Sequence, residues 1–143
     1  MVIAISVVMF CYWFRYTCSL ILSTHASEEY AGSVAASNRL EFPLAAMELA
    51  TAKGETLERI HGSLDRDYRL IGSLLRRGGN GSLHEISPED LILRADFHGL
   101  RLWFMVCRYF SETASRRALE EMSQIVRHFA NTFGERVADP SRA

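Results

Sequence analysis

Five histidines are the first residues to consider for metal or acid–base chemistry, and they are scattered: His25, His61, His84, His98 and His128. None forms an H-x-x-x-H or H-E-x-x-H pair, and none stands at metal-ligand spacing from a cysteine. His61 precedes two aspartates on an expected helix, as in a phosphotransfer helix, but the residues around it match no such signature. We therefore predict solvated or core histidines, with no metal site and no cofactor.

The motifs that hold phosphates or activate a nucleophile are also missing. G-x-G-x-x-G, G-x-x-x-x-G-K-[ST] and G-x-S-x-G do not occur. The glycine-rich stretch at 78–81 follows an expected helix rather than a strand, so it is typical of a linker. Adjacent carboxylates such as Glu120 and Glu121 diverge on a helix, which is a poor geometry for acid–base catalysis. The sequence predicts a protein that is not an enzyme.

The net charge and the cysteine content limit the classes of partner and the cellular location that we expect. The formal net charge is −1, which gives no basic footprint for nucleic acid. The three cysteines, Cys11, Cys18 and Cys107, are too few and too scattered for a disulfide framework. We expect three reduced thiols, in keeping with a cytoplasmic location of the soluble part.

The N-terminal segment has the length and composition of a membrane span. From Val2 to Thr24 a single charged residue, Arg15, occurs, and all 17 Asp and Glu residues follow it. A helix of this length measures about 34 Å, enough to cross a hydrocarbon layer of about 30 Å. Arg15 near mid-span costs about 2.5 to 3.5 kcal/mol, which the apolar residues outweigh by a thin margin. A cleaved signal peptide is the rival interpretation, but the basic n-region is absent. We predict a retained single-pass anchor.

The surroundings of Arg15 suggest a partner within the membrane. Arg15 lies in an aromatic run near mid-span, whereas aromatic belts sit at the interfaces. Helical spacing places small residues on the same face as the cation. We predict that this region packs on another membrane helix through Cys11, Tyr12, Trp13, Arg15, Tyr16 and Cys18. In the alternative, Arg15 snorkels to the nearer headgroups and the cysteines are simply small apolar residues.

The fold class predicted is all-α: one N-terminal transmembrane helix followed by a small three- to four-helix antiparallel bundle. We divide the chain into an anchor (1–25), a juxtamembrane helical segment (26–53), a soluble bundle (54–134) and a flexible tail (135–143). Within the juxtamembrane segment, Pro43 should break or kink the helix, with a short helix following over 44–52.

Apolar periodicity of three and four residues predicts the long helices. The first covers 55–77 and carries i,i+4 ion pairs on its outer side, Glu55 with Arg59 and Asp65 with Arg69. The second starts at Ser87-Pro88, a cap followed by proline at the first helical position, and runs to 110. The last begins after a break at 111–115 and stops at Gly134. Its inward residues are expected to be Leu119, Met122, Ile125, Val126, Phe129 and Phe133.

The helix expected at 88–110 carries two apolar stripes. The first can fill the core; it comprises Leu93, Phe97, Leu100, Phe104 and Cys107. The second points elsewhere; it comprises Leu102, Met105, Val106 and Tyr109. Either the helix is central in its own bundle, with the juxtamembrane segment over the second stripe, or a partner, a second copy or the membrane covers that stripe. We favour the central helix.

Two functions follow as expectations. The first is a non-enzymatic accessory or scaffold subunit of a membrane complex, anchored in lipid and bound to other membrane-protein subunits, with its C-terminal domain in the cytoplasm. The alternative is a membrane-tethered homodimeric regulator or adaptor that binds a partner or ligand through its bundle. Neither requires nucleic acid.

Overall fold

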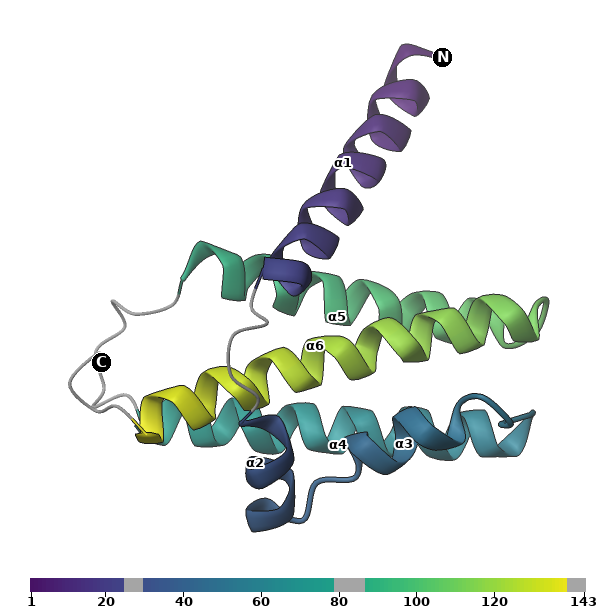
Figure 1. The fold of residues 1–143 in the computed structure, drawn as a ribbon. Helices are drawn as coiled ribbons and strands as arrows, with labels where there is room; N and C mark the ends of the chain where they lie inside the picture. The colour runs from purple at the N-terminus through teal and green to yellow at the C-terminus, as the bar shows by residue number, and fades with distance from the viewer. Residues whose placement is uncertain (25–29, 79–86, 139–143) are drawn as a thin grey trace.

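The computed structural model of the protein describes residues 1–24, 30–78 and 87–138, and within these ranges the chain forms helices and no strands (Figure 1). The helices are α1 (Val2–Thr24), α2 (Ala31–Asn38), α3 (Phe42–Glu48), α4 (Glu55–Gly78), α5 (Pro88–Cys107) and α6 (Glu112–Ala138). The all-α prediction is confirmed. With six helices in the described ranges, however, the structure has more than the predicted three to four in the bundle. His25, His84, most of the glycine-rich stretch and the last tail residues lie outside those ranges.

The central helix of the bundle is α6, not α5 as we expected. It contacts α1, α2, α3, α4 and α5, and it runs between α4 and α5 in Figure 1. Its apolar side chains are buried on a wide face, as the sequence predicted; they are Leu119, Met122, Ile125, Val126 and Phe129. A helix can touch five neighbours only if it is buried on most of its circumference. In the sequence, apolar residues on two sides of a helix were evident for α5 instead, but the second apolar stripe of α5 is exposed in the structure.

Helix α4 follows the predicted periodicity closely. It spans Glu55–Gly78, and its core positions are buried; they include Leu57, Ile60, Leu64, Ile71 and Leu75. The expected outer pair of Asp65 and Arg69 forms at 2.5 Å. Arg59, however, pairs with Glu48 of α3 at 2.7 Å rather than with the predicted Glu55. The i,i+4 spacing within α4 allows Arg59 to pair with Glu55, but Glu48 of the neighbouring α3 is within reach and takes its place.

The described part of the juxtamembrane segment folds as two short helices, with a break between them as the sequence indicated. Arg39 ends α2 in the left-handed conformation, with φ of 53° and ψ of 44°. Pro43 lies in the first turn of α3, where its missing N–H breaks no helical hydrogen bond. The break therefore comes before the proline rather than at it.

Both short helices start on side chains of the long ones. Asn131 of α6 accepts a hydrogen bond from the Ala31 N–H through Oδ1 at 2.7 Å. The fully buried Asp67 of α4 accepts from Glu41 N–H at 2.6 Å and Phe42 N–H at 2.8 Å. These bonds satisfy amide groups that a helix leaves unpaired at its first turn. Two helices that are too short to be stable alone are thereby held to the bundle.

The ends of α5 and α6 agree with the sequence only in part. Ser87 caps α5 as predicted, because its Oγ accepts from the Glu89 N–H at 3.3 Å. Helix α5 ends at Cys107, short of the expected 110, and α6 begins at Glu112. Helix α6 passes through Gly134 and ends at Ala138, so this glycine does not stop it. The first residues of the expected tail are helical.

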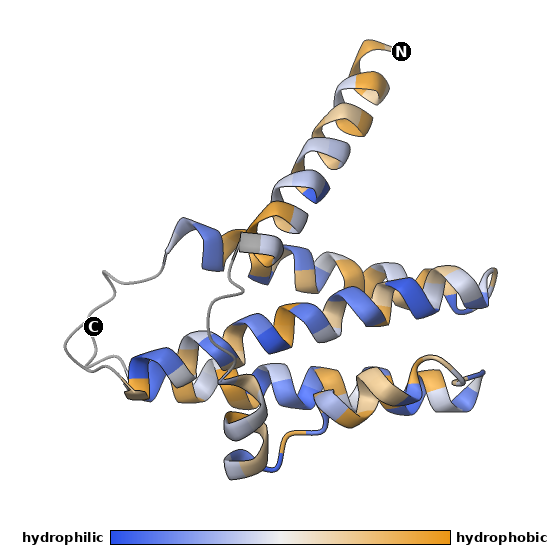
Figure 2. Ribbon diagram, viewed as in Figure 1, coloured by the Kyte–Doolittle hydropathy of each residue, from blue (hydrophilic) through white to orange (hydrophobic). Residues whose placement is uncertain are grey.

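Helix α1 projects away from the bundle for about half of its length (Figure 1). It is long and apolar enough to span a membrane by length and composition. Apolar colours prevail along its outer half in Figure 2. Its inner half lies against α5 and α6. The two halves therefore have different surroundings, and the boundary falls near Arg15.

Candidate functional site

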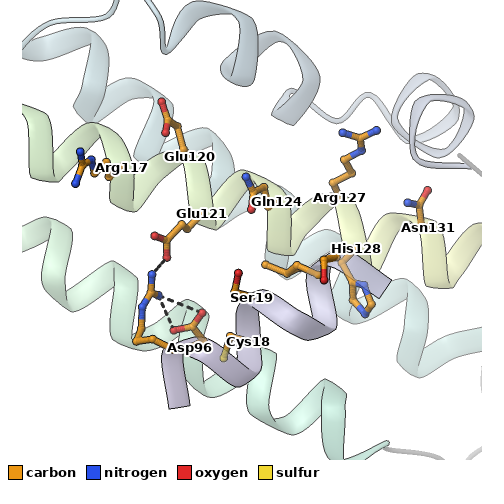
Figure 3. Close-up of a pocket in the computed structure, with 13 residues that line it drawn as sticks. Cys18, Ser19, Asp96, Arg117, Glu120, Glu121, Gln124, Arg127, His128 and Asn131 are labelled. Atoms are coloured by element: carbon orange, nitrogen blue, oxygen red, sulfur yellow. Dashed lines mark hydrogen bonds and ion pairs between the residues drawn. The ribbon is translucent and has the colours of Figure 1, made fainter. Parts of the chain in front are cut away.

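A cleft of about 770 Å³ lies where the inner half of α1 meets α5 and α6 (Figure 3). We call it the α1 cleft. It is lined by Arg15, Cys18, Ser19, Leu22, Ser23, Asp96, Arg117, Glu120, Glu121, Gln124, Arg127, His128 and Asn131. Asp96 comes from α5, the first five residues from α1, and the remainder from one side of α6.

An ion-pair network joins α1 to the bundle across this cleft. Arg15 Nη1 donates to Asp96 Oδ1 at 3.1 Å and to Oδ2 at 3.4 Å, and Nη2 pairs with Glu121. The Asp96 side chain is only 6% exposed, while that of Arg15 is 42% exposed. A buried carboxylate is costly without a counter-charge, so Asp96 requires a cation in this position. The network is called the Arg15 clamp below.

Apolar side chains of α1 support the Arg15 clamp. Cys18 is 2% exposed and belongs to the core of the bundle. Phe14, Ile21 and Leu22 are half-buried and pack against that core. Spacings of three and four residues put these positions on the Arg15 side of the helix. The inner half of α1 is thus a docked helix with its own amphipathic face.

The polar wall of the cleft comes from α6 and carries charges of both signs. In Figure 3, Arg117, Glu120, Gln124 and Arg127 succeed one another along that helix. Cations and anions in alternation produce no strong field for an anionic or cationic ligand. Among the residues that the structure describes, no group of three metal-binding side chains occurs. The arrangement holds α1 against the bundle.

The structure divides the predicted membrane-partner residues into two sets. Arg15 pairs with α5 and α6, and Cys18 lies in the core of the bundle, so both have contacts within the chain. The other four are exposed; they are Cys11, Tyr12, Trp13 and Tyr16. A role for these four in binding another chain stays a prediction.

The predicted partner residues on the bundle are all exposed. The exposed fractions are 65% for Leu102, 40% for Met105, 53% for Val106 and 71% for Tyr109. The expectation that the juxtamembrane segment covers this stripe is wrong, because α2 and α3 pack on α4 and α6 instead. The first stripe of α5 is buried as predicted. The second stripe is therefore a free surface of this chain.

Sequence reasoning missed Asp96 and Glu121. Asp96 directly precedes Phe97 within the core stripe of α5, and a carboxylate beside a core stripe needs a partner. Arg15, a lone cation in an apolar helix, needs one for the same reason. An ion pair between Arg15 and Asp96 could therefore have been predicted from the sequence, because each charge needs an opposite one.

The fold and the cleft together define a helical protein with one N-terminal helix long and apolar enough to span a membrane, clamped at its inner half to a bundle. Comparisons with known protein families and curated proteins, and of the fold with solved structures, find no match.

The Arg15 clamp can be measured by a double-mutant cycle. We expect Arg15→Met and Asp96→Asn to show a coupling energy of about 1 kcal/mol in mild detergent, a modest value because Arg15 is partly exposed. Chemical unfolding of the two single variants and the double variant gives that energy. Additive effects would mean that the pair contributes nothing to docking. Arg59→Met with Glu48→Gln is the control, an exposed pair from which we expect less coupling.

Proposed function

We propose that the chain is a single-pass membrane-anchored accessory or scaffold subunit of a membrane protein complex, without enzymatic activity. The observation that carries this proposal is the outer half of α1, where large apolar side chains have no cover from the chain. The exposed fractions are 80% for Ile3, 69% for Phe10 and 70% for Trp13. Water disfavours such a surface, whereas lipid and other membrane helices accept it.

The soluble helices supply the second half of the proposal. They form a bundle with a continuous core. A bundle tied to an anchor through the Arg15 clamp is held at a fixed position beside the membrane. Holding another subunit there is a task that needs surfaces and no reaction. We place the bundle on the cytoplasmic side because the three cysteines of the chain are free thiols.

Membrane extraction tests the anchor. We expect the full chain to stay with the membrane pellet in alkaline carbonate, because its outer helix is in lipid. Ile5→Lys with Val8→Lys should move most of the protein to the supernatant, since a cation in the hydrocarbon layer disfavours insertion, by up to about 2.5 to 3.5 kcal/mol at its centre. Leu44→Lys with Met47→Lys adds the same charge at exposed positions of α3 and should change nothing. Wild-type protein that is released by carbonate would contradict the anchor.

Crosslinking through Cys11 tests the accessory role. Cys11 is exposed while Cys18 and Cys107 are buried, so a thiol reagent reaches one position. An accessory subunit predicts crosslinked species that contain a second, different chain and disappear in Cys11→Ser. A band at twice the mass of the chain would instead support the homodimeric regulator.

A further inference from the structure

Helix α5 has an exposed face that carries no charge along its whole length. Large apolar residues dominate it: Leu91, Leu102, Trp103 and Val106, with Tyr109 and Phe110 just after the helix. We call this set the α5 outer face. Ala95 and Gly99 lie between these positions at helical spacing and are exposed too. A helix in contact with water normally carries charges on its outer side.

The α5 outer face lies on the same side of the bundle as the docked α1. Asp96 meets Arg15 of α1, and Trp103 and Phe110 follow Asp96 by seven and fourteen residues. Seven residues are almost two full turns, so Trp103 projects to the same side as Asp96. Ile92, four residues before Asp96, is half-buried on that side. The face therefore continues from the α1 docking site, and α1 leaves the bundle on this side (Figure 1).

The composition of the face fits the interfacial region of a bilayer. Trp103 and Tyr109 are 55% and 71% exposed, and such amphipathic rings favour the headgroup level. Arg94, Arg101 and Arg108 recur every seven residues along one edge, where Arg101 pairs with Asp65 and Arg108 with Glu58 of α4, so these two charges are offset within the bundle. The aromatic rings, rather than free cations, fit the membrane interface.

We propose that the α5 outer face rests in the headgroup region of the phospholipid bilayer, beside the point where α1 enters it. This inference rests on the proposed membrane anchor. A second copy of the chain is the rival occupant. Lipid is favoured because the face continues the α1 docking site, so an inserted α1 brings the face to the same surface.

The test uses the two tryptophans as separate reporters. The full chain is reconstituted in vesicles of phosphatidylcholine and phosphatidylglycerol, with or without bromines on the acyl chains near the headgroups. In Trp13→Phe, the remaining Trp103 should lose about half of its emission or more to the bromines, as expected for a side chain within roughly 5 to 10 Å of the interface. In Trp103→Phe, the remaining Trp13 reports on α1 alone.

Two charge variants in the Trp13→Phe background sharpen the result. Leu102→Glu should restore most of the Trp103 emission, because a carboxylate on the face disfavours lipid contact. Met47→Glu is the matched control at an exposed position of α3 and should leave the quenching unchanged. Circular dichroism confirms that both variants are folded. Unchanged quenching in Leu102→Glu would overturn the proposal.

The outcomes separate the two proposals. If Trp13 is quenched and Trp103 is not, the anchor stands and the α5 outer face does not lie on lipid. If Trp103 is in addition shielded from an aqueous quencher in proportion to protein concentration, a second copy occupies the face. If neither tryptophan is quenched, the membrane anchor fails as well.

Discussion

Replacing Asp67 by alanine should lower the free energy of unfolding by roughly 2 to 4 kcal/mol, because it leaves two backbone N–H groups at the start of α3 without their acceptor. The Phe42 N–H lies in a buried hydrogen bond, so water cannot readily replace the carboxylate there. We expect α3 to separate from α4 before the bundle unfolds. Hydrogen exchange at Phe42 and chemical unfolding of the whole chain measure the two effects.

Asp67→Asn is the matched control. It keeps one carbonyl acceptor for the two N–H groups and should cost less than half as much as the alanine. Equal losses in the two variants would contradict the capping role.

The ionisation of Asp67 provides a second readout. Burial raises the pKa of the Asp67 carboxyl above its ordinary value of 3.8, although the two backbone N–H groups and Arg66 oppose that shift. An acid with a raised pKa in the folded state binds protons more readily when folded. Its contribution to stability is complete below the ordinary pKa and is lost as the pH rises through the raised one. Wild type should therefore gain stability relative to Asp67→Asn on acidification.

Gly134→Ala should lower the free energy of unfolding by about 1 to 3 kcal/mol through overpacking between α6 and the start of α2. A Cβ at this position would lie 2.3 Å from the Tyr30 Cβ and 3.2 Å from Val34 Cγ2. The Tyr30 Cβ is fixed to the backbone and cannot move away alone. The bond from Ala31 N–H to Asn131 should lengthen as α2 shifts, and hydrogen exchange at Ala31 should rise.

Gly62→Ala separates overpacking from helix propensity. Gly62 lies in the interior of α4, and a Cβ there would meet nothing within 4 Å. This substitution should raise the free energy of unfolding by up to about 1 kcal/mol, because alanine favours a helix over glycine. A gain at Gly134 would contradict the close approach of α2 and α6, and a loss at Gly62 would contradict the helix-propensity effect expected of the control.

The sequence predicted those parts of the fold that depend on local spacing. The periodicity of α4 and α6 identified their buried sides, and Ser87-Pro88 located the start of α5. Each of these features is contained within one or two turns of a single helix. The second apolar stripe of α5 could also be predicted from the sequence, but the surface that covers it could not.

The parts that escaped prediction depend on residues far apart in the chain. Arg15 and Asp96 are separated by 81 residues, and no periodicity connects them. Gly134 had the appearance of a helix end because glycine serves both as a stop and as a point of close packing. The starts of α2 and α3 are set by Asn131 and Asp67, which are ordinary polar residues in the sequence of their own helices. Tertiary contacts decided all three.

Helix α1 is a continuous rod from Val2 to Thr24, and the bundle grips it by Arg15, Cys18 and Leu22. Because the bundle is fixed to one end of α1, a rotation of α1 about its long axis rotates the bundle by the same angle. A helix advances by about 100° per residue, so inserting one residue before Arg15 would point the bundle in a different direction. The orientation of the bundle about the α1 axis is therefore set by the register of α1.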